Sequence, residues 1–262
     1  MRVSNTGAAP VYDRVFLLSA VKRNEILTLE EVRAYGRDSF GDPGYVCLYG
    51  LEPADWYARG VRVLARTAVE CTRDELADLI GADVASIARS AGNSAGVLIV
   101  DPFAGSANTL HWLQRHLDAD RGVGFELDDG VYGLTRGNLA ILNSKIELVH
   151  GDYAAGLAAL DVPNDCLLVA FVAPPWGEAL SEAGLDLRAT RPPAAEVVGV
   201  VSRAFAGHRL LFATQLYERL ESKSVSDLTD HFDWSTMRMY DVDPPGRNHG
   251  VLLATKGWRP EV

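Results

Sequence analysis

From about residue 95 onward, short apolar runs alternate with longer stretches in which apolar residues recur at helical spacing. Apolar runs bounded by turn-forming residues predict buried strands, whereas apolar residues at i, i+3 and i+4 predict helices. The predicted strands are 97–100, 122–125, 146–149, 166–172 and 210–213, and the predicted helices between them are 108–117, 131–142 and 194–205. This alternation indicates an α/β fold with a doubly wound, mostly parallel sheet covered by helices on both faces.

The end of the chain breaks this alternation. Residues 234–242 and 251–255 are strand-like, and a link rich in proline and glycine, 243–250, joins them. A short link of this kind predicts a hairpin, which adds one antiparallel strand and brings the predicted sheet to seven strands.

The first part of the chain is predicted to be helical. Two segments, beginning at Thr28 and Thr72, fit the Thr-x-x-Glu capping box that starts helices. Asp83 is a candidate cap for another short helix. We therefore expect a helical extension or substrate lid over residues 1–69 and a main domain over 70–262. The aromatic pair at 56–57 either closes over a substrate or packs on the main domain.

Charge and composition narrow the choice of partners. The formal net charge is −10, and no run of basic residues is longer than the one in Val21-Lys22-Arg23. Both observations disfavour a long nucleic-acid footprint. A nucleotide-sized substrate in a local pocket stays open. No apolar stretch is long enough for a membrane span and the first residues do not resemble a signal peptide, so we expect a cytoplasmic protein without membrane contact.

The cysteines and histidines give no indication of a metal site or a disulfide framework. Cys47, Cys71 and Cys166 are far apart in the sequence, and no Cys-x-x-Cys pair occurs. His111 and His116 are five residues apart, which does not place them on one face of a helix.

Acidic residues follow three of the predicted strands. Asp101 and the turn at Gly105 follow the first strand, Glu126 ends the second and Asp152 follows the third. The carboxyl ends of parallel strands share one edge, so we expect these residues to line one crevice. Glu126 has the spacing at which an acid meets ribose hydroxyls, while the absence of G-x-G-x-x-G disfavours NAD. A helix cap is an alternative for Asp152.

The fourth predicted strand ends in Ala-Pro-Pro-Trp-Gly, residues 173–177. Two prolines lack N–H groups and cannot continue a sheet ladder. The motif therefore places free carbonyl oxygens and an aromatic ring at the same edge as the acids.

The four motifs together resemble those of class I S-adenosylmethionine-dependent methyltransferases, and most of all the trimethylguanosine synthase group, which methylates N2 of guanine. The motifs are Asp-Pro-Phe-x-Gly-x-x-x-Asn-Thr from Asp101, Gly-Phe-Glu-Leu-Asp from Gly124, Gly-Asp-Tyr from Gly151, and Ala-Pro-Pro-Trp-Gly from Ala173. The segment 70–77 also looks like that group's helix ahead of the first strand. The resemblance covers about residues 70–257 and implies a Rossmann-like methyltransferase domain.

The resemblance also implies roles for individual residues. The cofactor S-adenosylmethionine would contact Asp101 and Gly105 with its methionine part, Glu126 with its ribose, and Leu127 and Asp152 with its adenine. Asn108 and Thr109 would hold its carboxylate and the loop. The remaining cofactor-binding positions are Thr72, Phe103 and Tyr153. Ala173 and Pro174 would present carbonyl oxygens to the acceptor, and Trp176 would stack on a flat substrate.

Ala173 departs from the pattern of amino-methylating relatives, which have Asn, Asp or Ser there. The methyl side chain of alanine cannot accept a hydrogen bond from an amine, so only backbone carbonyl oxygens remain and a general base gains importance. The candidates are Glu178, Asp186, His111 and His249. We expect a methyltransferase acting on an amino or hydroxyl group of a small specialised metabolite. The alternatives are an N-methyltransferase of guanine in RNA or a capped nucleotide, and a non-catalytic cofactor-binding partner protein.

Overall fold

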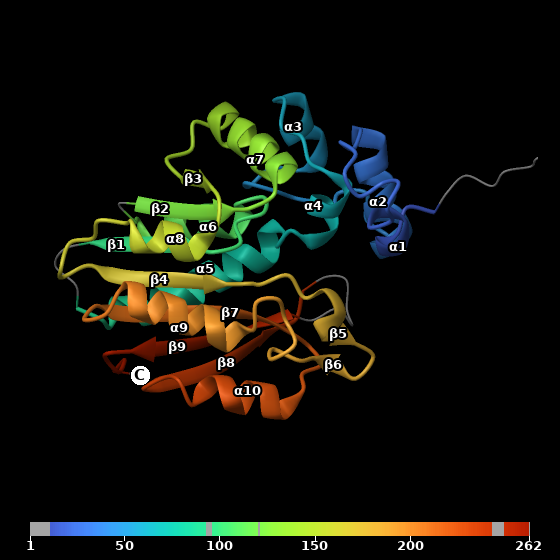
Figure 1. The fold of residues 1–262 in the computed structure, drawn as a ribbon. Helices are drawn as coiled ribbons and strands as arrows, with labels where there is room; N and C mark the ends of the chain where they lie inside the picture. The colour runs from blue at the N-terminus through green and yellow to red at the C-terminus, as the bar shows by residue number, and fades with distance from the viewer. Residues whose placement is uncertain (1–10, 93–95, 120, 243–248, 262) are drawn as a thin grey trace, which may run out of the picture.

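The computed structural model describes residues 11–92, 96–119, 121–242 and 249–261. Its centre is a seven-stranded sheet with the order β3-β2-β1-β4-β7-β9-β8 (Figure 1). The strands are β1 (Val97–Asp101), β2 (Arg121–Glu126), β3 (Glu147–His150), β4 (Leu167–Val172), β7 (Arg209–Tyr217), β8 (Trp234–Tyr240) and β9 (His249–Lys256). Strands β1, β2, β3, β4 and β7 pair in parallel, and β9 pairs antiparallel with both β7 and β8. The predicted fold class is confirmed, including the single antiparallel strand. Residues 243–248 of the hairpin link lie outside the described residues.

Helices cover both faces of the sheet, with α5 and α6 on one face and α8 and α9 on the other (Figure 1). The main-domain helices are α5 (Asp74–Arg89), α6 (Asn108–Leu117), α7 (Asp129–Ile141), α8 (Tyr153–Ala158), α9 (Ala194–Ala204) and α10 (Ser222–Thr229). A short 3-10 helix (Gly177–Ala179) and a small hairpin of β5 (Leu180–Ser181) and β6 (Gly184–Leu185) follow β4.

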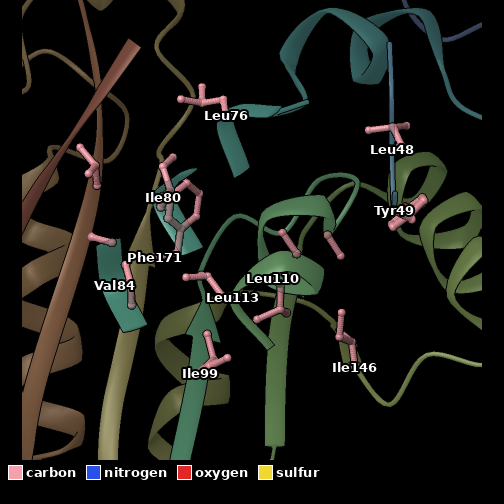
Figure 2. Packing of buried hydrophobic residues seen from close by; sticks show 14 of the residues in the cluster. Leu48, Tyr49, Leu76, Ile80, Val84, Ile99, Leu110, Leu113, Ile146 and Phe171 are labelled. Carbon is pink, nitrogen blue, oxygen red and sulfur yellow. The ribbon is translucent and has the colours of Figure 1, made fainter. Parts of the chain in front are cut away.

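The alternation of side chains along β4 explains why this strand is apolar at every position. Val169 and Phe171 belong to the hydrophobic cluster of α5 and α6, whereas Leu168 and Ala170 belong to the cluster on the opposite face. Successive side chains of a strand point to opposite faces, so a strand covered on both faces must be apolar throughout. Figure 2 shows Phe171 near Ile80 of α5, among the residues of the first cluster.

Four short helices make up residues 11–70. They are α1 (Arg14–Leu17), α2 (Leu29–Phe40), α3 (Pro53–Ala58) and α4 (Ala65–Glu70). These helices lie beyond the carboxyl ends of the parallel strands, as the blue region of Figure 1 shows. The Thr28 capping box is confirmed, because Thr28 accepts a hydrogen bond from the Glu31 N–H while the Glu31 side chain accepts one from the Thr28 N–H.

Two predictions about α5 were wrong. The helix begins at Asp74 after Arg73, without a side-chain cap, and the Thr72 hydroxyl instead donates to Gln215 Oε1 at 3.2 Å. Asp83 does not start a new helix, because α5 continues through it and its carboxylate accepts a hydrogen bond from the Tyr240 hydroxyl at 2.8 Å. In both cases a residue far along the chain supplies the partner that a local pattern cannot show.

The aromatic pair at 56–57 packs inside the N-terminal segment. Trp56 is fully buried and donates its indole N–H to the Val46 carbonyl at 2.9 Å, while the Tyr57 ring contacts the Arg62 guanidinium at 3.7 Å. The structure supports packing, although these two contacts are with the N-terminal segment itself and not with the main domain. Among the described residues, no helix combines the length and the apolar character that crossing a membrane requires.

Candidate active site

The turn after β1 lies across the neighbouring strand β2. The Ala104 N–H donates to the Phe125 carbonyl at 2.9 Å, and Gly105 has a positive φ of 52°. A Cβ added to Gly124 of β2 would lie 2.7 Å from the Ala104 Cβ. Glycine at 124 therefore allows the turn to approach the strand this closely.

Glu126 joins this turn to the end of β2. Its Oε2 atom accepts a hydrogen bond from the Gly105 N–H at 3.2 Å, and its Oε1 atom accepts one from the Asp128 N–H at 2.8 Å. The Thr135 hydroxyl of α7 donates to the Gly105 carbonyl at 2.7 Å. The structure thus brings Gly105 and Glu126 together at one edge of the sheet.

Asp101 is buried in this edge, with only 2% of its surface exposed. Its Oδ1 atom accepts a hydrogen bond from the Phe103 N–H at 2.9 Å, and no basic residue in the described part of the chain forms an ion pair with it. Burial raises the pKa of this carboxyl to about 7, and the nearby charge of Glu126 adds to the increase. A positive ligand at this position would favour the ionised form.

The third acidic residue has a different local role. Asp152 caps α8, accepting hydrogen bonds from the Ala154 and Ala155 N–H groups at 2.9 and 3.3 Å. Tyr153 is buried with its ring 5.2 Å from that of Phe103. Leu127, by contrast, is 71% exposed.

Asn108 at the start of α6 is 1% exposed and is engaged by the N-terminal part of the chain. Its Oδ1 atom accepts from the Tyr49 N–H at 2.7 Å, and its Nδ2 group donates to the Thr72 carbonyl at 2.8 Å and to Asp74 Oδ1 at 3.0 Å. Thr109 is buried in the same first turn. These bonds use both polar atoms of the Asn108 side chain to fasten the turn, so direct contact with a ligand is not evident there.

The Ala-Pro-Pro-Trp-Gly motif, residues 173–177, lies beside an aromatic cluster. Ala173 is half-buried, Pro174 is buried, and the Trp176 ring lies 5.7 Å from His249 in a stacked arrangement. Tyr217, at the end of β7, lies 6.0 Å from Trp176 and 5.7 Å from His249. One side of the Trp176 ring is therefore occupied by protein.

The four candidate bases have different surroundings. Glu178 is 95% exposed with Arg191 at 3.8 Å, and the Arg188 guanidinium lowers the pKa of the Asp186 carboxyl by hydrogen bonding to it. Burial lowers the pKa of His111, whose ring lies 5.8 Å from Tyr49. Of these four described residues, His249 is the one whose ring stacks on that of Trp176.

Sequence reasoning missed Tyr217. The fifth strand was expected to end at residue 213, but β7 extends to Tyr217. The polar residues Thr214 and Gln215 hid this extension, since they interrupt the apolar run although both are buried. A strand-end rule applied four residues later would have found Tyr217.

The described residues contain no group of three or more His, Cys, Asp and Glu side chains that could hold a metal ion.

The search of protein-family models gave no match, and no curated protein matches the chain. Solved structures do resemble it. A precorrin-6Y C5,15-methyltransferase from Geobacter metallireducens superposes with a TM-score of 0.46 and 15% identity, covering 72% of this chain and 91% of that one.

Two further solved structures show a similar level of likeness. An rRNA methylase from Streptococcus thermophilus has a TM-score of 0.46 and 12% identity, covering 71% of this chain and 99% of that one. A class I S-adenosylmethionine-dependent methyltransferase described as putative, from Listeria monocytogenes, has 0.44 and 18%, covering 70% and 62%.

Proposed function

We propose that the protein is an S-adenosylmethionine-dependent methyltransferase that acts on a small molecule. The observation that carries the proposal is the placement of Asp101 and Glu126 at the ends of β1 and β2 and of Gly105 in the turn after β1, with Trp176 after the adjacent strand β4. In open α/β sheets, ligands bind outside the carboxyl ends of the strands. This edge thus offers a cofactor side and an acceptor side next to each other.

The residues at this edge fit the proposed cofactor. Asp101 is a buried carboxyl without a basic partner in the described chain, which suits a positively charged sulfonium. Glu126 has an acceptor at the position where a ribose would bind, and exposed Leu127 beside it offers an apolar surface for a base. Asp152 retains a place near the adenine in this proposal, although its carboxylate also caps α8.

The chemistry of transfer needs mainly position and exclusion of water. When bound, the cofactor supplies an electrophilic methyl group. The carbonyl oxygens of Ala173 and Pro174 would accept hydrogen bonds from an acceptor amine and leave its lone pair directed at the methyl group. For a hydroxyl acceptor, His249 would take the proton, since it contacts the Trp176 ring.

The net charge of −10 favours a small acceptor over RNA, because RNA binding requires several phosphate contacts from Lys and Arg. The resemblance of the Ala-Pro-Pro-Trp-Gly motif to that of guanine N2 methyltransferases supports the second candidate, a capped nucleotide or RNA. Weak, salt-insensitive RNA binding in a filter assay supports the first candidate, whereas tight and salt-sensitive binding supports the second.

Calorimetry with S-adenosylmethionine and S-adenosylhomocysteine tests the cofactor assignment. We expect both to bind at pH 8. Asp101→Asn should weaken S-adenosylmethionine more than S-adenosylhomocysteine, since only the former carries the sulfonium charge. Glu196→Gln, on α9, is the control for loss of an acidic side chain and should change neither affinity. Absence of binding of both compounds to the wild-type protein would overturn the proposal.

A further inference from the structure

A cavity lies between the N-terminal segment, the start of α5 and Trp112 of α6. Its volume is about 690 Å³. The residues that line it include Phe40, Tyr45 and Trp112 as aromatic walls. None of the lining residues is a predicted cofactor or acceptor residue, although Asp74 accepts a hydrogen bond from Asn108. A cavity of this size can hold a small organic ligand.

Carboxylates dominate the charge of this cavity. Asp42, Glu52, Asp74 and Glu75 line it together with one basic residue, Arg73. Arg73 forms an ion pair with Glu75 at 2.7 Å. Within the described chain, the carboxylates of Asp42, Glu52 and Asp74 form no ion pair with a Lys, Arg or His side chain.

Asp74 is the most buried of these carboxylates, with 8% of its surface exposed. It accepts hydrogen bonds from the Gly50 N–H at 2.9 Å, the Asn108 amide at 3.0 Å and the Trp112 indole at 2.6 Å. All three donors are neutral, so they orient the carboxylate without cancelling its charge. The donors hold the carboxylate in place, and a cation in the cavity would be attracted by its charge.

Cys47 lies within reach of these charges. Its half-buried thiol lines the same cavity. Burial raises the pKa of this thiol to about 11, and the charges of Asp74, Glu52 and Asp42 contribute in that order. The three carboxylates therefore act together on a group inside the cavity.

Aromatic rings complete the lining. Phe40 and Tyr45 stack with centroids 3.5 Å apart, and Trp112 lies on the α6 side. The Arg73 guanidinium lies over the Tyr45 ring at 4.5 Å and the Arg115 guanidinium over the Trp112 ring at 5.1 Å, so the rings contribute apolar lining and not free faces for a cation. Apolar lining combined with carboxylates favours a positive group attached to an apolar body. We propose that this cavity binds an organic ammonium ion with an apolar body, at a site separate from the methyl-transfer crevice.

Calorimetry on the full chain with 4-phenylbutylammonium, and with 4-phenylbutanol as the neutral counterpart of similar shape, tests this site. We expect the ammonium compound to bind at least tenfold more tightly than the alcohol. The double variant Asp42→Asn/Glu52→Gln should weaken the ammonium compound by about threefold to tenfold, since exposed charge pairs contribute up to about 1 kcal/mol each. Both substituted residues are exposed, and thermal unfolding should confirm that the double variant remains folded.

Asp55→Asn is the matched control. Asp55 is exposed on α3, close to Glu52 in sequence, but does not line the cavity. The control should leave the affinity unchanged. Equal binding of the alcohol, or equal loss in the control and the double variant, would overturn the inference.

Competition with S-adenosylhomocysteine separates this inference from the proposed function. If saturating S-adenosylhomocysteine displaces 4-phenylbutylammonium, the compound occupies the methyl-transfer crevice and the separate site is refuted. If S-adenosylhomocysteine does not bind at all while the ammonium compound still shows the charge dependence above, the proposed function fails and the cavity assignment stands.

Discussion

Asp101 is the residue at which burial and charge conflict most directly. It is 2% exposed at the end of β1, and a single backbone N–H, that of Phe103, donates to its carboxylate. A buried acid favours its neutral form, which is why its pKa rises to about 7 through burial. Strongly shifted pKa values of this kind are common at functional sites.

The raised pKa of Asp101 predicts a pH-dependent stability. The carboxyl has a pKa of about 7 in the folded protein and near 3.8 when unfolded, so between these values the folded state binds more protons. Stability from this group should therefore fall as pH rises from about 4 to 7. Asp101→Asn, which can still accept from the Phe103 N–H, should be more stable than the wild type at pH 8, by roughly 2–4 kcal/mol, and similar at pH 4.

Urea unfolding at the two pH values measures this difference. Asp55→Asn removes an exposed acid and serves as the control, with little change expected at either pH. An Asp101→Asn variant that loses stability equally at both pH values would show that the carboxylate is not destabilising.

Trp176 is the residue that distinguishes acceptor binding from cofactor binding. Its ring follows β4 and lies against His249 and Tyr217. Trp176→Ala should therefore reduce turnover of the acceptor by at least about tenfold while S-adenosylhomocysteine affinity stays within twofold, as expected when a group touches only the acceptor. Trp176→Phe, which keeps an aromatic face, should retain more turnover. Equal losses in turnover and cofactor affinity would place the ring against the cofactor.

At the scale of elements, the turn between β1 and α6 depends on close contact with β2. A Cβ added to Gly124 would lie 2.7 Å from the Ala104 Cβ. A Cβ added to Gly133, in helix α7, would meet no atom within 4 Å in the described structure. Gly124→Ala should destabilise the protein by about 1–3 kcal/mol and weaken cofactor binding, because the turn must move away from the strand.

Gly133→Ala provides the matched comparison. The same methyl group enters open space on an exposed helix position and should stabilise the protein by about 0.5–1 kcal/mol. Urea unfolding and calorimetry measure both variants. If Gly124→Ala were as stable as the wild type and bound the cofactor normally, the packing of the turn on β2 would not be a constraint.

At the scale of the whole molecule, the N-terminal segment and the sheet share one core. The first hydrophobic cluster contains Leu17 and Trp56 of the segment together with Ile80 of α5, Ile99 of β1 and Val251 of β9. Further contacts join the surfaces, including the Asn138 Oδ1 of α7, which accepts from the Arg62 N–H at 2.9 Å, and an ion pair between Arg66 and Asp128. The division at residue 69 therefore does not coincide with a boundary between cores.

A shared core predicts a single unfolding transition for the full chain. Far-ultraviolet circular dichroism and tryptophan fluorescence should give coincident urea curves. Most helices lie outside the segment, whereas the five tryptophans report on both parts, with Trp56 inside the segment and the other four outside it. A fragment of residues 70–262 should lose cooperativity, because it exposes the surface that the segment covers. Two separate transitions in the full chain would instead indicate independent units.

The sequence was sufficient for the layers of the fold because strands buried on both faces must be apolar and helices must carry an apolar stripe. It also placed Asp101 and Glu126 correctly at strand ends, since these positions follow from the strands themselves. Helix α6 was predicted with its observed bounds, Asn108–Leu117. The residues from Thr72 match the capping-box pattern, but the predicted cap does not form because the Thr72 hydroxyl donates to Gln215.

What only the tertiary structure decided is which distant residues become partners. Thr72 meets Gln215, which is 143 positions away, and Trp176 stacks on His249 although they come from different strand ends. Asp74 is buried by partners from two other segments, Gly50 and Trp112. Local sequence fixes backbone preferences and burial periodicity over a few turns, whereas the partner of a buried polar group depends on the packing of elements. The acids at the sheet edge could therefore be predicted, and the aromatic cluster and the cavity at the start of α5 could not.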